Sequence, residues 1–168
     1  MSTDIFESEE VKQLYMYSIR LISRQDYSPF KLRKKLVSKI TRDQDKEIAI
    51  SNIEKTINII VKKNLINEEE YTRLKVIALA KKCLHETQII KTLEAEEISI
   101  SQDQITRILE DERLSTFKIL NDYIIKFVNK KKINFDDFKS KNKVFFHFCQ
   151  KGHQFTDIQD LINQISKN

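Results

Sequence analysis

Residues 21–36 have the sequence LISRQDYSPFKLRKKL, which predicts the end of one helix, a short turn and the start of another helix. Ser28 can accept a hydrogen bond at the open N-terminus of the second helix. Pro29 can occupy the first helical position, because no backbone N–H is needed there. Leu32 and Leu36 follow at a spacing of four residues, which places them on one face of that helix. The stretch therefore predicts two packed helices.

Apolar residues recur at helical spacing almost throughout the chain, most clearly in the stripe of isoleucines and valine from residue 50 to residue 61. We expect a first helix over residues 11–24 and further helices up to the C-terminal residues. Phe138, Phe145 and Phe148 are expected on the inner face of the eighth helix, with Gly152 as its C-terminal stop. The residues expected to cap the starts of later helices are Asn67, Ser101, Asn134 and Thr156.

Gly152 is the only glycine and Pro29 the only proline among 168 residues. Tight hairpin turns depend on glycine, so the composition argues against a β-sheet protein. Phosphate-binding loops need several glycines, which excludes P-loop and dinucleotide-binding sites. The composition and the apolar spacing together predict an all-α protein.

The spacing predicts nine helices in three groups of three, a tandem array of three-helix, helix-turn-helix-like repeats. A single compact nine-helix bundle is the alternative architecture. Charge follows the same division: a short acidic tail (1–10) precedes a basic repeat (11–64, net +8), an acidic repeat (65–112, net −5) and a second basic repeat (113–168, net +6). Such alternation favours a partner that carries both signs of charge, such as a nucleoprotein, although charged helix faces are often only solvated.

The groups that could support catalysis are few. His147, Cys149 and His153 lie close together, but two or three such residues without further ligands do not make a zinc site, so we expect no metal and no cofactor. We interpret Cys149 as a core cysteine flanked by exposed or half-buried histidines. The sequence contains no export signal and no apolar run that could span a membrane, so we expect a reduced, cytoplasmic, non-enzymatic protein that is monomeric.

Basic residues form the more informative pattern. Lys31, Lys35, Lys39 and Arg42 fall on one predicted face of the second helix, with Lys34 beside them, and could reach an anionic backbone together. An ordinary solvated helix face is the competing interpretation. Further candidate contacts with a filament or with DNA are Arg24, Tyr27, Lys126, Lys130, Lys131 and Lys132.

Three stretches, in order along the chain, resemble the RecX family of RecA regulators. The stretch 21–36 resembles the family's opening signature, a helix, a Tyr-Ser turn and a helix with regularly spaced leucines. Residues 63–71 (KNLINEEEY) are similar to its second signature, and residues 146–161 to its closing segment. The family's middle repeat usually has a glycine between its first two helices, where this chain has Cys83, Leu84, His85 and Glu86.

The resemblance implies a curved, elongated array of three-helix repeats that lies in the groove of the RecA–single-stranded DNA filament. It implies a negative regulator of RecA that inhibits filament growth, ATPase, strand exchange and coprotease activities, with no catalytic residues. Direct contact with single-stranded DNA is expected to be weak. The alternative is a helix-turn-helix transcription regulator of duplex DNA, although the second helix offers mostly lysines, which contact phosphates and specify little.

Overall fold

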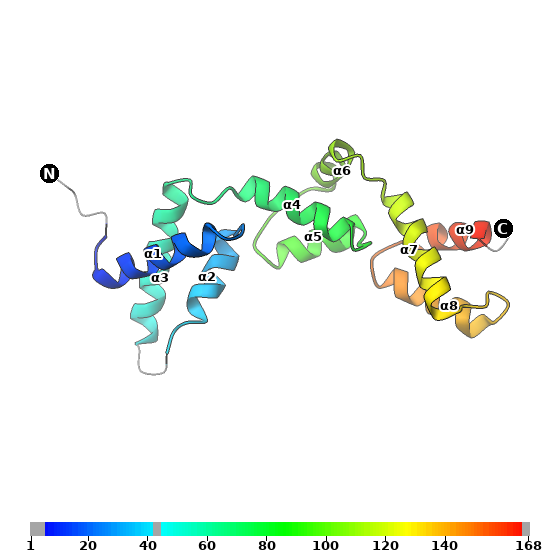
Figure 1. Cartoon of the computed structure of the whole chain (residues 1–168), viewed down its shortest axis with the longest axis horizontal. Helices are drawn as coiled ribbons and strands as arrows, with labels where there is room; N and C mark the ends of the chain where they lie inside the picture. Colours follow the sequence, from blue (N-terminus) through cyan, green and yellow to red (C-terminus); the bar gives the residue numbers. More distant parts are fainter. Residues whose placement is uncertain (1–5, 42–44, 166–168) are drawn as a thin grey trace. The chain divides into compact units, whose positions relative to one another are not determined.

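The structure, a computed structural model, describes residues 6–41 and 45–165, and over these residues it contains nine α-helices and no strand (Figure 1). The predicted all-α fold class is confirmed. The chain divides into two compact units, Met1–Thr72 and Arg73–Asn168. The helices are α1 (Glu9–Ile22), α2 (Pro29–Val37), α3 (Lys46–Lys62), α4 (Glu68–Ala80), α5 (Glu86–Glu94), α6 (Gln102–Asp111), α7 (Thr116–Lys131), α8 (Phe138–Cys149) and α9 (Phe155–Ile165). Helix α4 begins in the first unit and ends in the second. The division into an acidic tail and three repeats remains a prediction.

The first unit is built on α3, against which both α1 and α2 pack. Leu32 and Leu36 of α2 are 0% and 1% exposed, as the four-residue spacing predicts. They pack against the isoleucine face of α3, of which Ile53, Ile57 and Ile60 are buried. Each such side chain contributes roughly 1.5–3 kcal/mol when it is fully buried. The core of this unit therefore fixes α2 on α3, with the opposite face of α2 in solvent.

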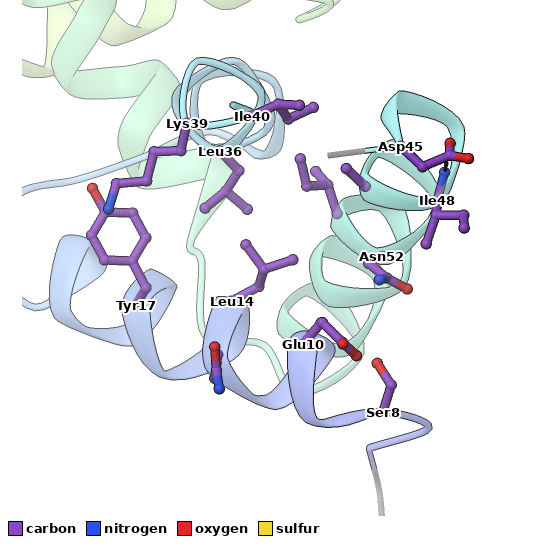
Figure 2. Close-up of a pocket in the computed structure, with 13 residues that line it drawn as sticks. Ser8, Glu10, Leu14, Tyr17, Leu36, Lys39, Ile40, Asp45, Ile48 and Asn52 are labelled. Carbon is purple, nitrogen blue, oxygen red and sulfur yellow. Dashed lines mark hydrogen bonds between the residues drawn. The ribbon is translucent and has the colours of Figure 1, made fainter. Parts of the chain in front are cut away.

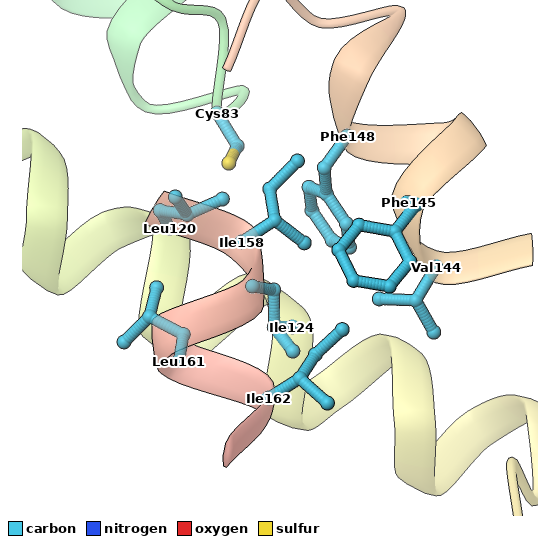
Figure 3. Packing of buried hydrophobic residues seen from close by; sticks show 9 residues of the cluster. All are labelled: Cys83, Leu120, Ile124, Val144, Phe145, Phe148, Ile158, Leu161 and Ile162. Carbon is cyan, nitrogen blue, oxygen red and sulfur yellow. The ribbon is translucent and has the colours of Figure 1, made fainter. Parts of the chain in front are cut away.

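The second unit contains a core that α7, α8 and α9 share (Figure 3). Phe145 and Phe148 of α8 are buried, as expected. Phe138 is 75% exposed, so its predicted place on the inner face is wrong. The helix begins only at Phe138, so this residue lies at its end and not above the core. The other members of the core are Cys83, Leu120, Ile124, Val144, Ile158, Leu161 and Ile162.

Helix starts follow side-chain caps, and most were predicted correctly. Ser28 accepts from the Lys31 N–H with Pro29 at the first position of α2, and Ser101 and Gln104 form the expected capping box. Asn67 accepts from the Glu70 N–H, as expected. Two predicted caps are wrong. Asp137 caps α8 in place of Asn134, whose side chain accepts from the Asp136 N–H in the preceding turn, and Thr156 lies inside α9.

Six helices end in the same way. A residue at the C-cap or within two residues after it takes a positive φ, and the next residue donates its N–H five residues back to a helix carbonyl, as in the Schellman motif. In α3, Asn64 has φ 51° and the Leu65 N–H lies 3.1 Å from the Ile60 carbonyl. The residues in the left-handed position are Asn64, Cys83, Glu97, Arg113, Lys132 and Gly152. Cys83 thus takes the conformation that a glycine would adopt at the end of α4, and Gly152 is confirmed as the stop of α8.

The turn after α4 is held by the helices that follow it within the second unit. Three successive backbone carbonyls, those of Lys81, Lys82 and Cys83, accept hydrogen bonds from Tyr123 Oη (2.7 Å), Lys151 Nζ (2.8 Å) and His153 Nε2 (2.9 Å). The His85 N–H donates in return to the carbonyl of Lys151 at 2.9 Å. These carbonyls have no partner inside α4, so the side chains of a later segment satisfy groups that a helix end leaves open.

Candidate functional site

Helix α2 carries the central part of the predicted basic stripe. Its buried leucines fix the helix on α3, and this orientation leaves Lys34 and Lys35 exposed in its last turn. Among the described residues, neither lysine has an acidic side chain within ion-pair distance. Arg33, between Leu32 and Lys34, differs, because its guanidinium forms a two-pronged ion pair with Glu54 of α3 at 2.7 and 3.2 Å. Arg33 therefore joins α2 to α3, whereas Lys34 and Lys35 are open to a partner.

Lys31 lies at the start of α2 and is half-buried. Its Nζ lies 5.1 Å from the ring centroid of Tyr27 and 5.8 Å from that of Tyr71. Contacts of this kind between a cation and an aromatic ring contribute about 0.5–1 kcal/mol when they are exposed to solvent. Tyr27 itself is only 5% exposed and belongs to the core of the first unit. Its ring can position Lys31, but it does not offer a face on which a base could stack.

Lys39 lies beyond the end of α2, because the helix ends at Val37 and Ser38 is its C-cap. The expectation that one helical face extends from Lys31 to Lys39 is therefore wrong. The turn directs Lys39 back to α1, where its Nζ lies 3.7 Å from the ring centroid of Tyr17. Arg42 lies outside the described residues. Arg24, in the turn between α1 and α2, is exposed.

The second set of candidate lysines lies on α7, in the other unit. Lys126, Lys130 and Lys131 are exposed, and Lys132 forms the left-handed end of the helix. Cations near a helix C-terminus are favourable in any protein, which is a sufficient structural reason for the last three. Lys126 lies about one turn earlier in α7, and its Nζ lies 5.9 Å from the ring centroid of Tyr123.

The structure adds three lysines that the sequence did not single out. Lys151 also lies over Tyr123, with its Nζ 5.8 Å from the centroid, and it donates to the Lys82 carbonyl. Lys81 and Lys82 are exposed beside it. These residues come from α7, the end of α4 and the turn after α8, so no local sequence pattern could have grouped them. Together with Lys126 they form a basic cluster around Tyr123.

In the cysteine and histidine group, His147 is half-buried as expected, but the environments predicted for Cys149 and His153 are wrong. Cys149 is exposed, and the buried cysteine is Cys83, which packs beside the buried His153. The reason is that α8 ends at Cys149, so His153 falls in the next turn and reaches the end of α4. Burial raises the pKa of the Cys83 thiol to about 11, against a smaller opposing effect of Lys151. That thiol is protonated at neutral pH and is a poor nucleophile.

The described part of the chain contains no group of three or more His, Cys, Asp or Glu side chains that could hold a metal ion. Over the same residues, no helix has the length and apolar character needed to cross a membrane.

Two solved structures share this arrangement of helices. One is described as the regulatory protein RecX, with a TM-score of 0.66 and 14% identity over 92% of this chain and 72% of that chain. The other is RecX from Lactobacillus salivarius, with a TM-score of 0.61 and 18% identity over 95% of this chain and 99% of that chain. No family model and no curated protein matches the sequence. The chain therefore has the RecX fold.

Proposed function

We propose that this chain, which has the RecX fold, is a negative regulator of RecA that binds the RecA–single-stranded DNA filament. On this proposal it inhibits filament growth, ATP hydrolysis, strand exchange and coprotease activity, and it acts as a cytoplasmic monomer. The observation that carries the proposal is the RecX fold combined with the exposed Lys34 and Lys35, which form no ion pair with the described residues, on a helix fixed by its buried face.

The charges of the two units support a nucleoprotein target. Lysines on α2 can contact phosphates or acidic protein surface, and they lack the planar, two-pronged geometry that reads a particular base. In the acidic middle of the chain, Glu96 and Glu112 are already paired with Lys75 and Arg73. Most of the remaining acids, such as Glu94 and Asp111, are exposed and repel bare DNA. A filament that presents both protein and nucleic acid is therefore a better match than DNA alone.

The test is ATP hydrolysis by preformed filaments of the cognate RecA on single-stranded DNA, titrated with this protein. We expect hydrolysis to slow at protein concentrations well below one per RecA monomer if the protein caps filament ends, and near one per monomer if it coats the groove. Strand exchange is measured in parallel. Filaments that hydrolyse ATP and exchange strands at an unchanged rate in excess protein would exclude this function.

The alternative, a duplex-reading transcription regulator, requires base-reading side chains on the exposed face of a recognition helix. Helix α2 contains no asparagine or glutamine, and its one arginine, Arg33, is held by Glu54. Tight, salt-resistant binding to one duplex sequence would support that alternative.

A further inference from the structure

The first unit contains a cleft bounded by α1, the end of α2 and the first half of α3 (Figure 2). We call it the α1–α3 cleft. Its volume of about 780 Å³ is within the usual range for ligand pockets, roughly 300–1,000 Å³. The apolar residues that line it are Leu14, Leu36, Ile40, Ile48, Ala49 and Ile53.

Helix α3 lines the cleft with one small residue between larger ones. Ala49 contributes a single methyl group between Ile48 and Ile53, so the space in front of it stays open. Ile48 is 61% exposed, and Leu14 and Ile40 are only half-buried. The cleft therefore leaves apolar surface in water that an apolar group could cover, with a gain of about 25 cal/mol per Å² buried.

The mouth of the cleft is acidic, although the surrounding sequence is basic. Glu10 lines it beside Ser8 and Asn52, and Asp45 lines it near Ile48 at the start of α3, as Figure 2 shows. Ser8 and Asp45 cap α1 and α3, and the two helix N-termini together contribute about one positive charge. This offsets about one of the two carboxylate charges and leaves the mouth negative. The lining lysine, Lys39, does not change that balance at the acidic side, since it lies over the Tyr17 ring at the other end.

We propose that the α1–α3 cleft binds a short segment of a partner protein in which a large apolar side chain stands beside a lysine or arginine. The apolar side chain fills the space in front of Ala49, and the cation lies on the side of the cleft that carries Glu10 and Asp45. A nucleic acid does not fit this site, because its phosphates would face the two carboxylates. The proposal does not depend on a RecA filament as the target of the α2 lysines.

The probe is a phage-displayed library of random 12-residue peptides, selected on the full chain with an excess of the soluble Ala49→Leu variant as competitor. The competitor removes peptides that bind anywhere but the cleft. We expect the selected peptides to converge on a large apolar residue within one helical turn of Lys or Arg. No convergence, or convergence on acidic peptides, overturns the proposal.

A fluorescein-labelled peptide from the selection is then titrated with variants. Ala49→Leu is expected to weaken binding at least tenfold, and Ile48→Ser, a surface change that keeps the fold, several-fold. Glu10→Gln with Asp45→Asn removes both charges, keeps an N-cap for α3, and should weaken binding about fivefold, with a smaller salt dependence. Ala78→Leu, on the exposed face of α4, is the matched control and should change nothing. If Ala49→Leu and Ile48→Ser bind the peptide as tightly as the wild type does, the proposal is overturned.

Sedimentation of the chain alone separates a second copy from a foreign partner. A concentration-dependent dimer that Ala49→Leu abolishes would make another copy of this chain the occupant, against the proposal.

Discussion

The imidazole Nε2 of His153 lies 2.9 Å from the carbonyl oxygen of Cys83, 70 residues earlier in the chain. A carbonyl oxygen only accepts, so Nε2 carries the proton and the imidazole is the donor. The same nitrogen lies 3.4 Å from the Cys83 thiol. One buried, neutral side chain thus joins the end of α4 to the turn before α9.

This contact makes the stability of the second unit depend on pH. Burial lowers the pKa of His153, with the neighbouring His85 and Lys151 acting in the same direction against the Cys83 hydrogen bond and Asp157. The unfolded chain therefore binds the proton more readily, and stability falls as the pH drops below the ordinary histidine pKa of about 6.5. Above that pH both states are neutral and the effect is absent.

We expect urea denaturation of the wild type to show a lower free energy of unfolding at pH 5.5 than at pH 7.5. His153→Gln keeps a donor but cannot be protonated, so the variant should lose part of that difference. The comparison between wild type and variant cancels the contribution of His147 and of the carboxyl groups. An identical pH dependence in both proteins would contradict the prediction.

The α2 lysines are tested by neutralisation. Lys34→Gln with Lys35→Gln removes two charges without placing a carboxylate at a helix C-terminus. If each lysine makes one ion contact of roughly 0.7 kcal/mol, about tenfold more protein is needed to inhibit the filament ATPase. Any binding to labelled single-stranded DNA should also lose about 1.4 from its logarithmic salt slope.

Lys118→Gln with Lys139→Gln is the matched control for that experiment. Both lysines are exposed and lie in the second unit, and the variant has the same net charge. If the control and the α2 variant lose inhibition equally, net charge and not the α2 surface is responsible.

Substitutions at two of the left-handed helix ends, Gly152 and Arg113, should change the free energy of unfolding in opposite directions. At Gly152 (φ 92°) a Cβ would lie 2.7 Å from Gln88 Cγ and 3.1 Å from His85 Cβ, so Gly152→Ala should cost about 2 kcal/mol. At Arg113 (φ 53°) the exposed side chain is not needed for the turn, so Arg113→Gly should stabilise by about 0.5–1 kcal/mol. Thermal unfolding of the two variants beside the wild type measures both. A loss of stability in Arg113→Gly would show that this side chain has a further role.

The two cysteines should differ in reactivity. Iodoacetamide is expected to modify the exposed Cys149 in the folded protein and to reach Cys83 only after unfolding, because that thiol is buried and protonated. Mass spectrometry of the digested protein, with and without urea, identifies the labelled residue. Rapid labelling of Cys83 without urea would show that the end of α4 opens in the native state.

Local patterns predicted the fold class and most helix starts, because a cap such as Ser28 or Ser101 acts within three residues. The predicted caps of α8 and α9 were wrong because several polar residues lie near each helix start. At α8, for example, the sequence could not rank Asn134 against Asp137. The predicted end of α2 was wrong because the lysines recur at helical spacing beyond Val37, whereas the helix ends at that residue.

Contacts between distant segments had no signature in the sequence. The hydrogen bond from His153 to Cys83 joins the turn after α4 to the turn after α8, and these turns meet only in the folded second unit. The basic cluster of Lys81, Lys82, Lys126 and Lys151 around Tyr123 also forms only in the folded second unit. The cleft was also missed, because Ala49 within an isoleucine stripe resembles any other helix-forming residue.

The shared ending of six helices bears on how far this sequence can change without loss of the fold. Five residue types besides glycine occupy the left-handed position, so the turn depends on its backbone hydrogen bonds. In five of the six turns the next residue is aliphatic, such as Leu65 or Ile98. Mutation can therefore exchange the residues at the five turns without glycine while the path of the chain is kept. A fold held in this way can be kept while the sequence diverges, in line with the 14% and 18% identity to the two similar structures.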